Sequence, residues 1–260
     1  MSVTLSQETE RPHVAHLRID ANELNLLSLE LADSVRETVE STPDDVSVLT
    51  IAAPRPDDGV RGLTAGLDLE WAHDLTPHEG QDLLYAFYDM IQSIRDLEAV
   101  TICGCGDYTL GAGFELAIAC EFRVATDDAA LGLPEVNVGL PTVIHGGLLV
   151  RLVGEGIANE LIYRGEPIDG ARASELGIVT DAVGADEYAE TVDGLVDELA
   201  AKSPHVMTLQ KRVMKRLRSN GVESGIYGSV ADIGRAFGSH DQREAMAAFL
   251  EDREPEFEGR

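Results

Sequence analysis

Residues 106–126, GDYTLGAGFELAIACEFRVAT, hold the pattern that decides the fold: small residues, an apolar helical stretch with one acid, and a second apolar run. A helix that begins near Gly111 places Glu115 in its first turn, where the helix dipole and free backbone N–H groups favour a carboxylate. We expect strands at about 100–105 and 122–125, on either side of this helix. Alternation of helices with short apolar strands predicts an α/β fold with mostly parallel pairing.

The same alternation extends to both sides of this stretch and then stops. Apolar runs predict further strands at about 13–19, 46–53 and 178–183. Helical spacing predicts helices at about 26–39 and 80–97 and, after the last strand, at 186–202, 204–218, 222–237 and 242–251. We therefore expect a core over residues 1–200 and a helical C-terminal subdomain over residues 201–260.

The chain of 260 residues is strongly acidic, with 47 aspartate and glutamate residues against 20 lysine and arginine residues and a net charge of −27. Such a surface repels nucleic acids and anionic membranes, so we expect neither as a partner. The acids are spread along the chain, and lysine occurs only at 202, 211 and 215. This pattern favours a cytoplasmic protein of a halophile, because molar salt shortens the Debye length to about 3 Å. An acidic interaction protein is the alternative.

Several kinds of site have no support in the sequence. Cys103, Cys105 and Cys120 lie in apolar context without the paired spacing of a zinc site, and the histidines form no HExxH motif. We therefore expect buried free thiols and no metal. GAGFEL does not complete a dinucleotide-binding GxGxxG motif, and no GxSxG motif is present. The N-terminus lacks the features of a secretory signal, and no apolar run is long enough to span a membrane.

Two acids and two glycine-containing loops remain as candidates for chemistry. Glu115 by itself is typical of a helix-start residue, and Glu135, in GLPEVNVGLP, is typical of a solvated turn. If they meet, a carboxyl with a burial-raised pKa can donate a proton while its ionised partner accepts one. The loops 62–66 and 111–113 offer unhindered backbone N–H groups. Two such groups that converge on a carbonyl oxygen form an oxyanion hole, at about 3–4 kcal/mol per donor in the transition state.

Three blocks together resemble the crotonase superfamily, the enoyl-CoA hydratase/isomerase family. RGLTAGLDL (61–69) is similar to its FxAGADL loop, residues 106–126 to its NGxxxGGGxELAxxCDxxxA block, and LGLPEVNVGLP (131–141) to its FGxPEVxxGxxP block. The two glutamates stand 20 positions apart, as in hydratase members. The resemblance covers about residues 10–260. It implies an α/β, crotonase-like spiral of repeated ββα units with a helical C-terminal subdomain that covers the active site and forms trimers or hexamers.

The resemblance also implies roles for individual residues. Glu115 and Glu135 are the expected catalytic pair, and the backbone N–H groups of Thr64 and Ala112 the expected oxyanion hole. The residues expected to bind substrate are Arg61, Thr64, Ala65, Gly66, Leu67, Asp68, Gly111, Val143 and His145. The implied reaction is hydration of a 2-enoyl-CoA or dehydration of a 3-hydroxyacyl-CoA, with coenzyme A as part of the substrate and no permanently bound cofactor.

Some positions depart from the family pattern and leave alternatives open. Residues 142–145, TVIH, replace a glycine-rich helix start and should reshape the acyl pocket. His145 lines that pocket with or without a chemical role. We expect Arg61 and the basic cluster at 211–218 to help bind the phosphates of coenzyme A; alternatively, the cluster only offsets nearby acids. A double-bond isomerase of the same family and a non-catalytic acyl-CoA-binding protein remain alternative functions.

Overall fold

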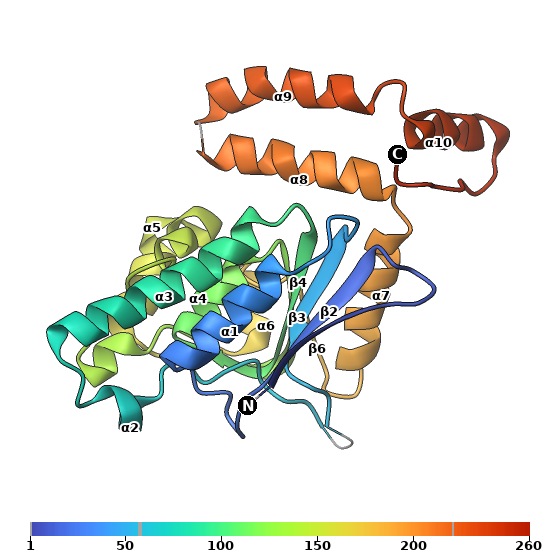
Figure 1. Cartoon of the computed structure of the whole chain (residues 1–260). Helices are drawn as coiled ribbons and strands as arrows, with labels where there is room; N and C mark the ends of the chain where they lie inside the picture. The colour runs from blue at the N-terminus through green and yellow to red at the C-terminus, as the bar shows by residue number, and fades with distance from the viewer. Residues whose placement is uncertain (1, 57–58, 220) are drawn as a thin grey trace.

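The computed structural model describes residues 2–56, 59–219 and 221–260. Within these residues, six strands lie side by side in sequence order in one mixed sheet (Figure 1). The strands are β1 (Ser2–Gln7), β2 (Val14–Asp20), β3 (Val48–Ala52), β4 (Val100–Leu110), β5 (Phe122–Gly132) and β6 (Asp181–Val183). β1 and β2 are antiparallel, and each later neighbouring pair is parallel. The predicted α/β class with mostly parallel pairing is confirmed.

The strands differ from the prediction at one edge and at two ends. β1 has no predicted counterpart because its SVTLSQ sequence is mostly exposed at the sheet edge, where no apolar pattern is needed. β4 and β5 are each 11 residues long and continue beyond the predicted ends at Cys105 and Ala125. The ladder between them shifts register around Gly106, and the strands then pair again further along.

The re-paired ends of β4 and β5 position the two candidate acids. Leu110 of β4 pairs with Gly132 of β5, and the N–H of Gly111 donates to the carbonyl of Gly132 over 2.9 Å. Glu115 follows the first of these ends and Glu135 follows the second. Parallel strands end at the same edge of a sheet, so the two segments emerge next to each other.

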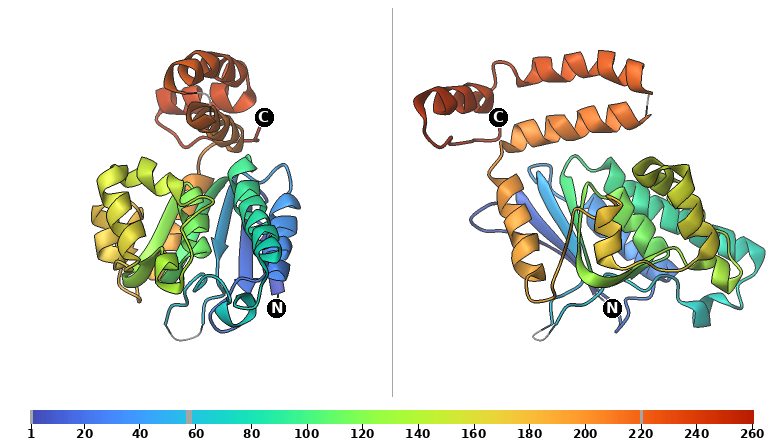
Figure 2. Two further views of the ribbon diagram at one scale, coloured as in Figure 1. Left: turned by 90° about the vertical axis from the view of Figure 1, so that its left-hand side faces the viewer. Right: turned by 180° about the vertical axis from the view of Figure 1, so that it is seen from behind.

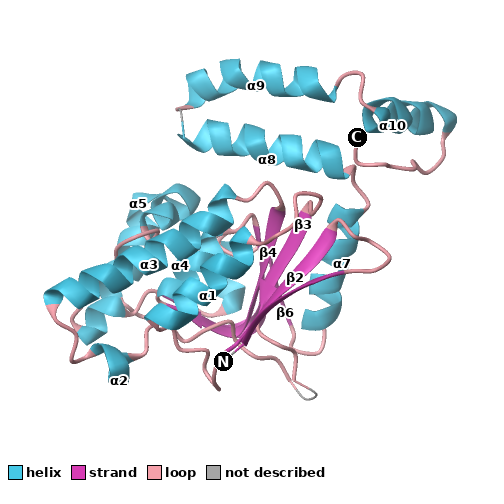
Figure 3. Ribbon diagram, in the orientation of Figure 1, coloured by secondary structure: helices cyan, strands magenta, loops and turns pink. Residues whose placement is uncertain are grey.

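Helices cover both faces of the sheet (Figure 3). The helices of the core are α1 (Leu29–Glu40), α2 (Leu69–Ala72), α3 (Pro77–Asp96), α4 (Ala112–Ala119), α5 (Gly147–Arg164), α6 (Gly170–Glu175) and α7 (Tyr188–Ala200), with a 3-10 turn, η1, at Glu135–Val138. α1, α3 and α4 share the larger hydrophobic core with one face, and α7 packs on the other. In the described residues, no helix combines the length and apolar character needed to cross a bilayer.

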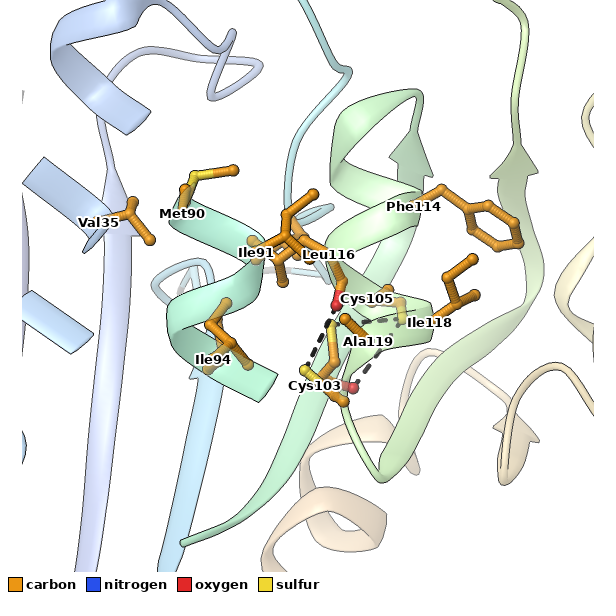
Figure 4. Packing of buried hydrophobic residues seen from close by; sticks show 14 of the residues in the cluster. Val35, Met90, Ile91, Ile94, Cys103, Cys105, Phe114, Leu116, Ile118 and Ala119 are labelled. Atoms are coloured by element: carbon orange, nitrogen blue, oxygen red, sulfur yellow. Dashed lines mark hydrogen bonds between the residues drawn. The ribbon is translucent and has the colours of Figure 1, made fainter. Parts of the chain in front are cut away.

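α4 packs within the larger core, where its side chains lie near the thiols of Cys103 and Cys105 (Figure 4). Phe114 and Leu116 are almost fully buried on this short helix, which is apolar nearly all round because other elements surround it. Cys103, Cys105 and Cys120 are free and buried, as predicted. Within the described residues, no cluster of histidine, cysteine or acidic side chains could hold a metal ion.

Three helices follow α7 and form a group apart from the sheet (Figure 2). They are α8 (Pro204–Ser219), α9 (Val222–Ala236) and α10 (His240–Glu251). The basic residues of α8 form ion pairs with acids of the same chain: Lys211 and Arg218 with Glu121, Arg212 with Glu98, Lys215 with Asp96, and Arg216 with Asp232. The structure therefore supports the alternative in which this cluster offsets nearby acids, and it places none of the cluster at the cavity described below.

Candidate active site

A cavity of about 570 Å³ lies between α2, α3, the start of α4 and the segment 134–144. Its walls are mainly apolar, and in the described part of the chain the ionisable side chains that line it are Glu115 and Glu135. The predicted site residues on its walls are Ala65, Gly66, Leu67, Gly111, Ala112, Glu115, Glu135 and Val143. The structure therefore brings together both acids and most of the predicted binding residues.

Glu115 occupies the first turn of α4 and is 2% exposed. Its Oε2 accepts a hydrogen bond from the backbone N–H of His145 over 2.7 Å, and the N–H of Gly146 also faces the carboxylate. Burial raises the pKa of Glu115 to about 8, and the nearby charge of Glu135 acts in the same direction against the two N–H groups. Glu115 is therefore mostly protonated at neutral pH.

Glu135 begins the η1 turn and is half-buried, so it is more accessible to water than Glu115. Its Oε2 accepts a hydrogen bond from the hydroxyl of Thr142 over 3.1 Å. Burial raises the pKa of Glu135, while hydrogen bonds from Thr142 and from its own backbone oppose the rise. The two carboxyls thus share one cavity but differ in surroundings, as proton transfer between an acid and a base requires.

Gly111 is the position where the backbone must approach a carboxylate closely. A Cβ atom at Gly111 would lie 3.3 Å from Oε1 of Glu135, and the φ angle of this residue is +57°. Only glycine adopts such a conformation without strain. Gly111 also provides no side-chain cap for α4, and within the described residues the N–H of Ala112, on the cavity wall, has no hydrogen-bond acceptor.

Thr64 lies behind the cavity wall, whereas Leu67 lies on it. Thr64 is 1% exposed, and its hydroxyl accepts from the N–H of Gly66 over 3.0 Å. Leu67 forms a parallel bridge with Leu27, whose N–H donates to the carbonyl of Gly66 and whose carbonyl accepts from the N–H of Asp68. The N–H of Leu67 belongs to the same trans peptide group as the Gly66 carbonyl, so it points in the opposite direction, away from Leu27. In the residues that the structure describes, this N–H has no hydrogen-bond acceptor.

Arg61 and Asp68 were predicted to bind substrate, but neither lines the cavity. The guanidinium of Arg61 pairs with Asp20 over 2.8 Å and donates to the side chain of Asn25 over 3.0 Å. Asp68 is the N-cap of α2 and accepts from the N–H of Trp71 over 3.1 Å. Both side chains therefore organise the loops next to the cavity in this structure.

His145 is 4% exposed and does not line the cavity either. Its ring stacks on Tyr88 with a centroid separation of 5.3 Å, and its Nε2 lies 3.3 Å from Oε1 of Gln92. Burial lowers the pKa of His145 to about 4, so the ring is neutral at physiological pH. The contribution of His145 to the site is the backbone N–H that it donates to Glu115.

Sequence reasoning missed several residues that shape the site. Ile144 has a φ angle of +57°, which is strained for a β-branched residue, and this conformation directs the next two N–H groups toward Glu115. Thr142 was considered only as part of a departing segment, yet its hydroxyl holds Glu135. The sequence predicted the helix α3 but did not show that its side chains Leu83 and Phe87 form an apolar wall of the cavity.

Comparisons with known proteins agree with this geometry. The family model "Enoyl-CoA hydratase/isomerase" matches residues 9–260. The chain belongs to this family. It is 33% identical over 251 residues to a probable enoyl-CoA hydratase of Bacillus subtilis, covering 95% of each chain. It is 29% identical to the 2,3-dehydroadipyl-CoA hydratase of Escherichia coli, covering 91% of this chain and 89% of the relative.

The fold comparison gives the same result. An enoyl-CoA hydratase subunit of Geobacillus kaustophilus superimposes with a TM-score of 0.88 at 28% identity, covering 100% of this chain and 99% of the other. The predicted crotonase-like α/β fold with a helical C-terminal region is thereby confirmed. Members of the enoyl-CoA hydratase/isomerase family act on acyl-CoA substrates and hold no permanent cofactor, so family membership implies an acyl-CoA substrate.

Proposed function

We propose that this chain hydrates a 2-enoyl-CoA thioester, and dehydrates the corresponding 3-hydroxyacyl-CoA, with Glu115 and Glu135 as the catalytic pair. The observation that carries the proposal is the meeting of these two carboxyls on one apolar cavity, next to the open N–H groups of Leu67 and Ala112. The family membership supports the same reaction class.

The two N–H groups supply the electrostatic part of the mechanism. The thioester carbonyl oxygen accepts hydrogen bonds from Leu67 and Ala112, and these bonds strengthen as the enolate develops negative charge. Each such donor contributes about 3–4 kcal/mol to the transition state. This proposal replaces Thr64, the donor expected from the sequence, with Leu67, because Thr64 is buried behind the wall.

The two carboxyls supply the proton transfers. Burial raises the pKa of Glu115 to about 8, so Glu115 carries a proton at neutral pH. We assign the ionised form to Glu135, which is more exposed and accepts a hydrogen bond from Thr142. As the oxygen of water bonds to C3, the ionised Glu135 takes a proton from the water, and Glu115 donates its proton to C2. The reverse sequence removes water from a 3-hydroxyacyl-CoA. After each turnover the proton moves from Glu135 back to Glu115.

Substitution of each glutamate by glutamine tests the proposal. We expect Glu115→Gln and Glu135→Gln each to lower kcat for crotonyl-CoA hydration by about 10²–10⁴-fold, the usual contribution of a general acid or base. Loss of the conjugated thioester absorbance follows the reaction. Unchanged turnover in both variants would refute the assignment.

A double-bond isomerase is the second candidate, favoured by the unequal surroundings of the two acids. In that reaction one carboxyl shuttles a proton between carbons and the other is dispensable. Loss of activity in only one variant, without incorporation of labelled oxygen from water, identifies the isomerase. A chain that binds acyl-CoA in calorimetry without turning it over would instead be a binding protein.

We also propose that residues 201–260 form a subdomain that assembles the chain into trimers or hexamers. Large apolar side chains are exposed on its helices, including Tyr227 at 86%, Phe249 at 86% and Leu250 at 83%. Exposed apolar patches of this kind mark protein–protein contacts. In the described residues, none after Ile144 lines the cavity of its own chain, so any cover from this subdomain comes from a neighbouring copy.

The net charge of −27 supports function in the cytoplasm of a halophile.

A further inference from the structure

We propose that the cavity selects enoyl-CoA substrates whose acyl chain is a neutral hydrocarbon and discriminates against acyl chains that end in a carboxylate. This inference rests on the proposed function and adds the chemical class of the acyl group. It is carried by the charge and polarity of the cavity walls.

The positions of the reacting groups locate the acyl chain. The carbonyl oxygen is held at Leu67 and Ala112, and the carbons C2 and C3 lie between the two glutamates. The coenzyme side of the thioester follows the loop 65–69, so the atoms beyond C3 lie against α3 and the segment 138–144. Each of these elements contributes to the cavity wall.

The wall on the acyl side is mainly apolar from its buried end to its mouth. Leu83 and Phe87 of α3 are 3% and 2% exposed and form the buried end. Toward the mouth, Leu84, Val138 and Leu140 are 41%, 49% and 44% exposed. Contact between these large apolar side chains and water is unfavourable. A hydrocarbon chain that contacts these side chains removes apolar surface from water on both partners.

No positive charge is available for an acyl carboxylate. Among residues 2–56, 59–219 and 221–260, no lysine, arginine or histidine lines the cavity, and its two ionisable side chains are both acids. The polar side chains on the acyl side are Thr76, which forms a capping box with Glu79, and Gln81. A terminal carboxylate would lose water and find no cation, in a cavity whose own ionisable side chains are both acids.

Three substrates measure the preference on the wild-type chain. 2-Hexenoyl-CoA and 2,3-dehydroadipyl-CoA both have six acyl carbons and differ in ending with a methyl group or a carboxylate. We expect kcat/KM to rise about fourfold per methylene from crotonyl-CoA to 2-hexenoyl-CoA, the factor that corresponds to about 0.8 kcal/mol. We expect kcat/KM for 2,3-dehydroadipyl-CoA to be at least about 100-fold below that for 2-hexenoyl-CoA, as for an unpaired charge in an apolar site. Values within tenfold of each other would overturn the proposal.

A cation introduced at the cavity wall tests the cause of the preference. Gln81 is exposed on α3, so Gln81→Arg is compatible with folding, and Gln81→Met is the matched uncharged control. We expect the ratio of kcat/KM for 2,3-dehydroadipyl-CoA to that for 2-hexenoyl-CoA to rise at least tenfold in Gln81→Arg. The ratio should stay within about twofold of wild type in Gln81→Met. An equal rise in both variants would overturn the electrostatic explanation.

Binding of unreactive analogues separates this inference from the proposed reaction. If no thioester is hydrated, the proposed function fails, while the wall chemistry still predicts tighter binding of hexanoyl-CoA than of adipyl-CoA in calorimetry. We expect a difference in Kd of at least tenfold. Equal Kd values would refute the inference whether or not the chain is a hydratase.

Discussion

The buried carboxyl of Glu115 should make the protein less stable as the pH rises. Its pKa is about 8 in the folded chain against an ordinary value of 4.5, a difference of about 3.5 units. The folded state therefore binds more protons than the unfolded state between these two pH values, and the free energy of unfolding falls with pH in this window. At about 1.4 kcal/mol per unit, the loss reaches roughly 3 kcal/mol at pH 7 and 4–5 kcal/mol above pH 8.

Glu115→Gln removes this penalty because glutamine is neutral at every pH and keeps an oxygen that accepts the N–H of His145. We expect the variant and the wild type to have similar free energies of unfolding near pH 4.5. The variant should then become more stable than the wild type as the pH rises, by roughly 3 kcal/mol at pH 7. The same substitution abolishes the proposed proton donor, so stability and activity should change in opposite directions.

Denaturant unfolding between pH 4.5 and 8.5, at constant molar KCl, measures this difference. Glu155→Gln, at an exposed site on α5 outside the cavity, is the matched control and should change stability by less than about 0.5 kcal/mol at each pH. A Glu115→Gln variant no more stable than the wild type at pH 8 would refute the reasoning. A gain in stability of equal size at every pH would show that packing, and not the charge of the carboxylate, is responsible.

Three further outcomes are expected. Thr142→Val removes the hydroxyl that stabilises the ionised form of Glu135. The acidic limb of the pH profile of kcat/KM should therefore move to higher pH, whereas Thr142→Ser should leave this limb near its wild-type position. Introducing Lys at both Tyr227 and Phe249 should shift the assembly to smaller species in sedimentation velocity, and unchanged sedimentation would exclude these exposed residues from the interface. The free energy of unfolding of the wild type should rise with KCl concentration, because salt screens the repulsion between acidic side chains in a chain of net charge −27. An unchanged free energy of unfolding from 0.1 M to 2 M KCl would contradict the halophilic interpretation.

The sequence by itself determined the strands after β1, the helices α1, α3, α4 and α7 to α10, and the two acids, whereas α2, α5 and α6 were not predicted. Apolar spacing placed Glu115 in the first turn of a helix, and that position is confirmed, because helical periodicity depends on residues only three or four apart. The change from alternating strands and helices to helices alone after residue 183 was visible for the same reason. β1 was not predictable in this way because an exposed edge strand needs no apolar pattern.

Only the tertiary structure decided how these elements become a site. Which N–H group faces the cavity depends on the pairing of Leu67 with Leu27, 40 positions earlier, and no local pattern records that pairing. The raised pKa of Glu115 depends on burial by other elements, and the donation from His145 depends on a strained backbone at Ile144. The periodicity of a sequence indicates which side of a helix or strand is apolar. The direction of a backbone N–H group and the exposure of a carboxyl to water are instead set by contacts between distant segments.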